Sequence, residues 1–252
     1  MIFDSHAHYL SSAFDEDREV LLSHLFQTTI CGIIEGGTTV ADSRKALTLA
    51  ENYPSLWAAV GIHPQEIRDF SETDIDELRI LSTHPKAVAI GEIGLDYHYN
   101  DGPSREIQHR VFREQLALAK DVSLPVVIHD RDAHEDTMSL LKQFRPIGVV
   151  HCFSGSVEMA REIVKLGMYI GIGGVLTFKN ARKLVEVAKE LPLDRLLLET
   201  DAPYLAPVPL RGERCDSSMI LHTAATLAAL RGLTTQEILS VAEENARRLF
   251  AL

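Results

Sequence analysis

The stretch GVVHCFSGSVEMAREIVKLGMYIGI, residues 148–172, carries the unit that repeats through this chain. It begins with a short apolar run, Gly148–Val150, and ends with another, Tyr169–Ile172. Between the two runs, the segment VEMAREIVKLG follows Ser156, a residue type that caps helices, and stops at Gly167, a residue type that ends them. The stretch predicts a strand, a helix and a second strand, which is the pattern of a parallel βαβ unit.

The same alternation fills the rest of the 252 residues. Helical patterns are clearest over residues 105–121, 179–191 and 234–250, the last with Thr234 or Thr235 as its cap. Eight strand-then-helix units in about 250 residues predict an α/β fold, a single (β/α)8 TIM barrel over residues 1–252 with its site at the C-terminal ends of the strands. The six other apolar runs are Ile2–Phe3, Gly32–Ile34, Leu56–Val60, Ala87–Ile90, Val126–Ile128 and Leu196–Leu198.

The main alternative is a doubly wound open sheet, which usually has fewer strands and a Gly-rich phosphate loop after the first strand. Here the first strand leads into DSHAHY, residues 4–9, which disfavours that fold. On a strand, residues two apart point the same way, so His6 and His8 would present two imidazoles to one side. This pair alone fits hydrogen-bonded surface histidines about as well as it fits metal ligands.

The composition excludes several classes of protein. The chain is 46% apolar and has a formal net charge of −11, so it lacks the broad basic surface of a non-specific duplex DNA binder. No apolar segment is long enough for a membrane span, and the N-terminus does not resemble a signal peptide. Cys31, Cys152 and Cys215 show no metal-site or redox spacing and favour reduced thiols. We therefore expect a cytoplasmic monomer with no membrane partner.

Polar residues follow most of the predicted strands, where the site of a (β/α)8 enzyme lies. Any one of them could be a hydrogen-bonded core residue, but burying so many polar side chains without partners would be costly. Cys152 is expected to point to the opposite face from its neighbour His151 and to pack there. In chain order, the strand-end residues are His6, His8, His63, Glu92, Asp96, His129, Arg131, His151, Glu199 and Asp201. The other histidines are interpreted as surface residues: His24, His84, His98, His109, His134 and His222.

Four imidazoles and two carboxylates around one barrel mouth can hold two divalent cations. Two cations about 3.5–4 Å apart need a bridging anion, and Glu92 can serve as one. Such a pair makes hydroxide available near neutral pH. A nearby carboxylate such as Asp201 can take the proton of the attacking water and return it to the leaving group. The pattern predicts metal-assisted hydrolysis.

Eight motifs, in order, resemble the TatD family of metal-dependent hydrolases, within the amidohydrolase superfamily: FDSHAH, GIHP, GEIGLDY, HDRDAHED, HCFSGS, GIGGVLTFKNA, LLLETDAPYLAP and ENARRLF. The resemblance runs from residue 3 to residue 250 and implies a TIM barrel with two divalent ions, which could be Mg, Mn or Zn. It implies that Glu92 bridges the two ions and that His63 faces a phosphate oxygen of the substrate. The implied ligands are His6, His8 and Asp201 for one ion and His129 and His151 for the other.

Family members are mostly described as deoxyribonucleases, several of them 3′→5′ exonucleases on single strands. The resemblance therefore implies a deoxyribonuclease that acts on nucleic acid ends, with Asp201 as general base. Arg131, Arg211 and Arg214 are expected to bind phosphate, since arginine holds phosphate bidentately. Arg211 and Arg214 fit solvated loop charges equally well. Residues 210–219, LRGERCDSSM, depart from the family's frequent HRGKRNEP, which leaves the substrate open.

Two other functions stay open. The same activated water could attack the carbonyl of a small ester or amide, including an aminoacyl ester, as amidohydrolase relatives do. A barrel that only stores metal is the third alternative, although storage needs neither Asp201 as an acid–base group nor an anion-facing His63. Aromatic residues near the mouth could stack on terminal bases or simply pack; they are Tyr97, Tyr99, Phe153 and Tyr204.

Overall fold

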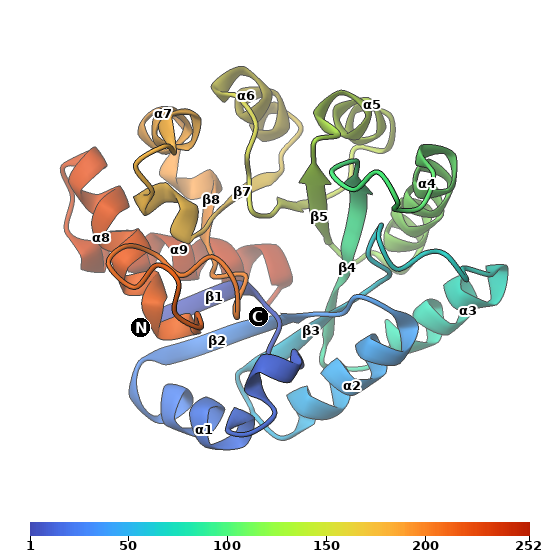
Figure 1. Ribbon diagram of the computed structural model, residues 1–252, viewed down its shortest axis with the longest axis horizontal. Coiled ribbons are helices and arrows are strands. Elements are labelled where there is room, and N and C mark those ends of the chain that lie inside the picture. Colours follow the sequence, from blue (N-terminus) through green and yellow to red (C-terminus); the bar gives the residue numbers. More distant parts are fainter.

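The computed structural model describes residues 1–252, apart from the side chain of Glu72. Eight strands form one parallel sheet in sequence order, with the helices packed around its outside (Figure 1). The strands are β1 (Ile2–Ala7), β2 (Ile30–Gly36), β3 (Leu56–Val60), β4 (Ala87–Asp96), β5 (Val126–Arg131), β6 (Gly148–Val150), β7 (Tyr169–Ile172) and β8 (Leu196–Leu198). This order confirms the predicted barrel, because a doubly wound sheet reverses its strand order.

The helices follow the strands as the repeat predicts. They are α1 (Arg18–Thr28), α2 (Val40–Glu51), α3 (Glu72–Leu81), α4 (Arg105–Val122), α5 (His134–Phe144), α6 (Val157–Lys165), α7 (Arg182–Glu190), α8 (Ile220–Arg231) and α9 (Thr235–Phe250). Ser156 caps α6 by accepting a hydrogen bond from the backbone N–H of Met159. Thr234, and not Thr235, caps α9 in a capping box with Glu237.

Short polar contacts join the first and last strands. The Ser5 hydroxyl donates to the carbonyl of Leu198 at 3.1 Å, and the backbone N–H of Asp201 donates to the carbonyl of His6 at 3.0 Å. Ala7 and Ala202 form an isolated parallel bridge. The barrel is therefore nearly closed, and the end of β1 lies beside the segment that follows β8.

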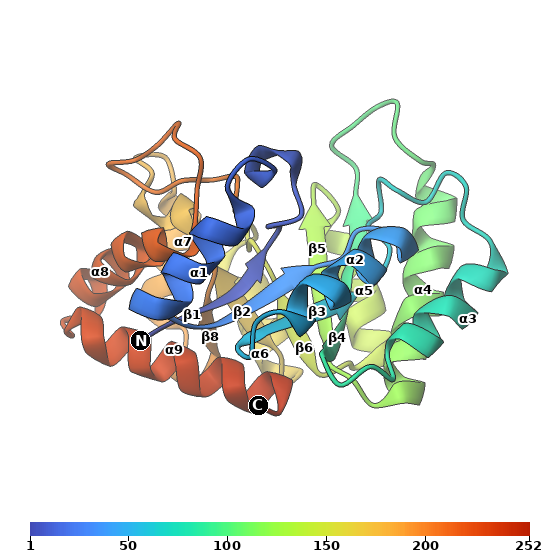
Figure 2. The same cartoon turned by 90° about the horizontal axis from the view of Figure 1, so that it is seen from below.

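The barrel interior has its own apolar core. A cluster of buried residues draws on all eight strands, for example Phe3, Ile34 and Val127, and only the inside of a barrel allows such a contact. Leu249 and Phe250 of α9 belong to the same cluster. Helix α9 thus covers one end of the barrel, and the long loops rise at the other end (Figure 2).

Four strands are longer than the apolar runs that predicted them. β1, β2, β4 and β5 continue into polar residues, and β4 extends to Asp96 where the apolar run ends at Ile90. The ladder hydrogen bonds are made by the backbone, so polar residues belong to these strands wherever a neighbouring strand remains beside them. The extensions carry half of the ten strand-end residues: His6, Glu92, Asp96, His129 and Arg131.

Candidate metal centre

The loops at the carboxyl ends of the strands surround a cavity of about 1220 Å³. His6 is fully buried below this cavity, where it contacts Glu92. The predicted site residues that line the cavity come from β4 and β5 and from the segments that follow β1, β3, β6 and β8: His8, His63, Glu92, His129, Arg131, His151 and Asp201. The structure thus brings the predicted ligand residues together.

Glu92 of β4 lies between two groups of possible ligand atoms. Its Oε2 is 3.3 Å from His6 Nε2 and 3.4 Å from His8 Nε2. Asp201 Oδ1 is 3.7 Å from the first of these nitrogens and 3.4 Å from the second. Four ligand atoms from β1, β4 and the segment after β8 therefore face one small volume.

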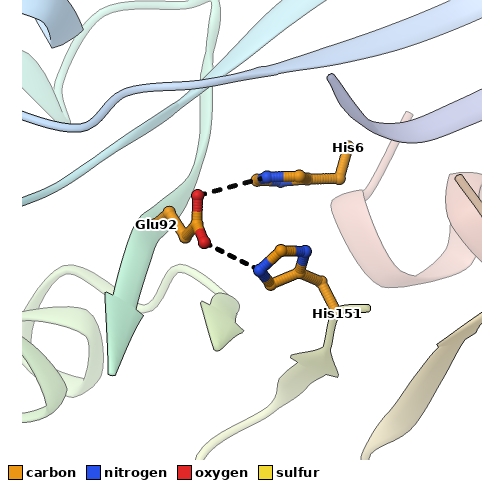
Figure 3. A group of neighbouring side chains, drawn as sticks. All are labelled: His6, Glu92 and His151. Carbon is orange, nitrogen blue, oxygen red and sulfur yellow. Dashed lines mark hydrogen bonds and ion pairs between the residues drawn. The ribbon is translucent and has the colours of Figure 1, made fainter. Parts of the chain in front are cut away.

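The other oxygen of Glu92 faces the second group. Its Oε1 is 2.7 Å from both His129 Nδ1 and His151 Nε2, and these nitrogens are 3.4 Å apart. Figure 3 shows Glu92 with one oxygen directed to His6 and the other to His151. Glu92 has the geometry of a carboxylate that can bridge two cation sites.

The distances between these atoms fit cation coordination. Ligands of a tetrahedral zinc lie about 2.0–2.1 Å from the ion and therefore about 3.3 Å from one another. His6 Nε2 and His8 Nε2 are 3.0 Å apart, and their distances to Glu92 and Asp201 are 3.3–3.7 Å. Imidazole nitrogen and carboxylate oxygen together suit Zn, Mn or Fe. The residues present fit a divalent cation.

Hydrogen bonds fix which ring nitrogen of two histidines points into the site. His8 Nδ1 lies 3.1 Å from the carbonyl oxygen of Gly36, so this nitrogen donates and Nε2 is left as the ligand atom. His129 Nε2 lies 3.3 Å from Asp96 Oδ2, which leaves its Nδ1 toward Glu92. Such outer partners orient metal-binding imidazoles and raise their basicity.

Asp96 is a site residue to which the sequence assigned no role. His63, Asp96 and His129 form a further group with metal-ligand spacing. A neutral imidazole has one free lone-pair nitrogen, and that of His129 already faces Glu92. Asp96 is therefore better explained as the acceptor for the His129 ring than as a metal ligand. The sequence signal was its spacing of four from Glu92, which places both on one face of a strand.

Charges within the site keep its carboxylates ionised. Burial alone would raise the pKa of Glu92, but the charge of His151 and its other histidine neighbours holds that pKa well below its usual range. Burial alone would likewise raise the pKa of Asp201, but the hydrogen bond from His8 outweighs burial and lowers that pKa. Burial lowers the pKa of His6 to about 4, so its ring is neutral near pH 7. The two carboxylates and His6 thus have the protonation states that cation binding requires. Burial would lower the pKa values of His8, His129 and His151, but their carboxylate neighbours raise them, so a cation must displace a proton from each of these rings.

His63 presents an N–H to the cavity. Its Nδ1 accepts a hydrogen bond from the backbone N–H of Gln65 at 3.2 Å, and burial lowers its pKa to about 3. The neutral ring therefore carries its proton on Nε2, which lies 3.6 Å from Glu92 Oε1. A donor in this position can contact an anionic group placed beside Glu92.

Buried carboxylates hold the ends of the strands around the site. Asp4 Oδ2 accepts from the hydroxyls of Thr200 at 2.6 Å and Ser217 at 2.7 Å. Glu35 accepts from the backbone N–H groups of Tyr9 and Leu10, both at 2.9 Å. Both carboxylates thereby position the segments that carry His8 and Asp201. The sequence assigned a function to neither.

A model of the TatD related DNase family matches residues 3–251 of the chain. The chain belongs to the TatD family. It is 44% identical over 255 residues to the uncharacterized metal-dependent hydrolase YabD of Bacillus subtilis, with 100% of both chains covered. It is 35% identical over 257 residues to the 3'-5' ssDNA/RNA exonuclease TatD of Salmonella typhimurium, covering 99% of this chain and 98% of that protein.

The crystal structure of YJJV, a TatD homolog from Escherichia coli, matches with a TM-score of 0.93 at 36% identity, covering 100% of this chain and 98% of that one. This TatD-family chain is a metal-dependent hydrolase acting on ester bonds. Among the described residues, no helix is long and apolar enough to cross a membrane.

The three arginines expected to bind substrate in this TatD-family protein lie in different surroundings. Arg131 lines the cavity. Arg214 makes two hydrogen bonds to Asp17, at 2.6 and 2.7 Å, and Arg211 lies 4.3 Å from the ring centre of Phe178. Neither Arg211 nor Arg214 is among the described residues that line the cavity. Loop charge is therefore the better interpretation of Arg211 and Arg214.

The prediction for Cys152 was wrong. It lines the cavity and does not pack on the opposite face, because β6 ends at Val150 and the backbone of Cys152 has a φ of 43°. Strand alternation does not extend to a residue outside the strand. The other six histidines lie outside the metal-spaced groups of the described residues. Two of them are partly buried and bonded to acids, His109 to Asp136 and His134 to Asp130.

Proposed function

We propose that this protein is a two-metal nuclease that shortens single-stranded DNA from its 3′ end. One observation carries the proposal: the two oxygens of Glu92 face two adjacent groups of ligand atoms, at 3.3–3.4 Å and at 2.7 Å. Phosphoryl transfer is one of the reactions that a pair of cations serves, by stabilising both the attacking and the leaving oxygen. The printed activity of the Salmonella typhimurium relative, a 3'-5' ssDNA/RNA exonuclease, supports the choice of substrate.

The proposed ligands follow from the two groups. Glu92 would bind both ions, His6, His8 and Asp201 would complete the shell of one, and His129 and His151 that of the other. Bound there, divalent cations supply an activated water nucleophile and positive charge beside the phosphoryl oxygens. Mg, Mn and Zn are the proposed candidates.

The chain's own residues would orient the substrate and move the proton. Asp201, ionised because the hydrogen bond from His8 outweighs burial, would accept the proton of the attacking water and pass it to the leaving oxygen. His63 Nε2–H would donate to a phosphate oxygen, and Arg131 would hold a second one. These roles require a phosphate group that lies over Glu92.

We further propose that residues 1–252 act as one domain, as a monomer, in the cytoplasm. One sheet that runs from Ile2 to Leu198 and a family match over residues 3–251 support the single domain. Monomeric state and location stay predictions from the sequence.

Hydrolysis of a small ester or amide is the alternative. The pairing of Arg214 with Asp17 favours this alternative. It removes Arg214, in the loop over residues 210–219, from the side chains that could bind a phosphate. The same site could direct water to a carbonyl carbon.

A substrate panel separates the two functions. Metal-stripped protein would be loaded with Mg, Mn or Zn and given 5′-labelled single-stranded DNA and RNA, aminoacyl esters and lactams, with Glu92→Ala as the inactive control. The proposal expects a ladder of shortened DNA that requires metal and wild-type protein. Turnover of esters or lactams without any shortened DNA would reject it in favour of the alternative.

A further inference from the structure

The cavity is larger than a single scissile group needs. Its volume of about 1220 Å³ lies above the range of about 300–1,000 Å³ that is usual for small-molecule sites. Beyond the metal ligands it reaches Arg182 and Lys183, at the start of α7. The space therefore suits a substrate that continues away from the reacting bond.

The part of the cavity formed by β5 and α7 presents cations without acidic partners. Arg131, Arg182 and Lys183 all line it, and all three are exposed. Within the described residues, none of the three has a carboxylate within ion-pair distance, whereas Arg44, Arg79 and Arg214 each have one. In a chain with a net charge of −11, such unpaired cations around one cavity mark a place for an anionic ligand.

The part of the cavity formed after β2 and β3 has the opposite charge. Asp42 of α2 and Glu66 of the segment after β3 line it. Asp42 accepts hydrogen bonds from the backbone N–H and hydroxyl of Thr38, both at 3.1 Å, which hold it in place. Asp96 and Asp130 line the β4–β8 half as well, but both are buried and bonded to histidines. Outside the metal ligands, the exposed charges are therefore basic in the β4–β8 half, which phosphates should prefer to the acidic β2–β3 half.

Two exposed aromatic rings stand in the same β4–β8 half. Tyr99 and Tyr204 are 50% and 58% exposed, and both line the cavity. They are the two aromatic residues among the exposed large hydrophobic side chains of the described chain. Arg131 lies over the ring of Tyr99 at 5.3 Å, so a stacking surface and a phosphate ligand are adjacent there.

We infer that the substrate strand crosses the β4–β8 half of the mouth, with its non-scissile phosphates on Arg182 and Lys183 and its bases against Tyr99 and Tyr204. This inference rests on the proposed function and names the part of the site that selects a polynucleotide over a small phosphodiester. Arg182 and Lys183 are binding residues here, remote from the reacting phosphorus.

The test compares two substrates in three variants. Arg182→Ala and Lys183→Ala each remove one of the cations, and Lys189→Ala removes one exposed cation from the far end of the same helix, α7. Each protein, loaded with metal, would be assayed on a single-stranded 12-mer of deoxythymidine and on bis(4-nitrophenyl) phosphate, over a range of KCl concentrations.

We expect Arg182→Ala and Lys183→Ala each to raise KM for the 12-mer about tenfold at low salt, the size of one charged hydrogen bond. Their kcat and their rate on the small diester should match those of wild type. The slope of log(kcat/KM) against log[KCl] should become less steep by about 0.7 for each cation removed, because one phosphate contact is lost. Lys189→Ala should behave as wild type.

If all three variants had the KM and the salt slope of wild type on the 12-mer, the inference would be overturned and the proposed nuclease would stand. A wild-type protein that hydrolyses the small diester and no oligonucleotide would overturn both. A loss on both substrates in Arg182→Ala and Lys183→Ala, with kcat reduced, would also contradict the inference, since it would place these residues at the reacting phosphate.

Discussion

At the scale of single residues, only a few atoms orient each imidazole of the metal centre. His129 Nδ1 lies 2.7 Å from Glu92 and 3.4 Å from His151, and its Nε2 makes one contact, 3.3 Å to Asp96. Its pKa, which burial would lower, is raised to about 9 by the hydrogen bonds to these two carboxylates. A cation must displace that proton, and Asp96 then keeps the remaining N–H directed away from the site.

Asp96→Asn should therefore weaken cation binding. The amide is a poorer acceptor than the carboxylate, so the His129 ring loses its fixed orientation, and we expect metal affinity to fall about 10–100-fold with little change in unfolding temperature. Titration of the metal-free protein with Co²⁺, followed by visible absorption, measures this directly. Asp132→Asn is the matched control, because Asp132 bonds the exposed His98, which is not a ligand. An unchanged affinity in Asp96→Asn would show that Asp96 does not position His129.

At the scale of elements, strand β2 is shaped to leave room for the ligands of β1. A Cβ added at Gly36 would lie 2.8 Å from Cε1 of both His6 and His8, closer than such atoms approach in proteins. The Gly36 carbonyl also accepts the hydrogen bond from His8 Nδ1. A glycine at this place is needed because two rings lie against it.

Gly36→Ala should push both rings away from Glu92 and reduce metal affinity at least tenfold, while the barrel still folds. Metal content after dialysis against a fixed free Zn²⁺ concentration, together with circular dichroism, tests this. Gly167→Ala is a control whose added Cβ meets no atom within 4 Å, so that any loss it causes comes from the strain of a side chain at a φ of 90° and not from a contact. Normal metal content in Gly36→Ala would contradict the contact.

The junction of β1 with the segment after β8 predicts a pH effect. Burial raises the pKa of Asp4 to about 6 from 3.8. The native state therefore binds a proton more tightly than the unfolded chain does. The stability contributed by this group is complete below about pH 3.8 and is lost as the pH rises through about 6.

Wild-type protein should lose up to about 3 kcal/mol more unfolding free energy between pH 4 and pH 7 than Asp4→Asn does. Urea unfolding in EDTA, at several pH values, provides the measurement. Asp121→Asn, which removes an exposed carboxylate paired with Arg79, is the control. Parallel pH profiles for wild type and Asp4→Asn would mean that Asp4 titrates in the native state as it does in the unfolded chain.

At the scale of the whole molecule, the repeat of strand and helix predicted the architecture, because near-continuous apolar strands fit few folds other than a parallel barrel. His6, His63 and Glu92 were recognisable since each follows an apolar run, and barrel chemistry lies there. What the sequence did not predict depends on distant partners. For Arg214 the sequence left substrate binding and loop charge equally open, and its partner Asp17 lies 197 residues away. Asp4 likewise finds its partners at Thr200 and Ser217.

Glu92 is proposed to join two cation sites that act together, and counting the bound ions during turnover tests this. Metal-free wild type and Glu92→Gln would be titrated with Mn²⁺. In each sample, bound ions per chain would be measured by equilibrium dialysis and shortening of a 5′-labelled single-stranded DNA would be followed. We expect two ions per wild-type chain, turnover that rises as the second one binds, and fewer ions with no turnover in Glu92→Gln. Full turnover with one ion, or two ions and normal turnover in Glu92→Gln, would contradict it.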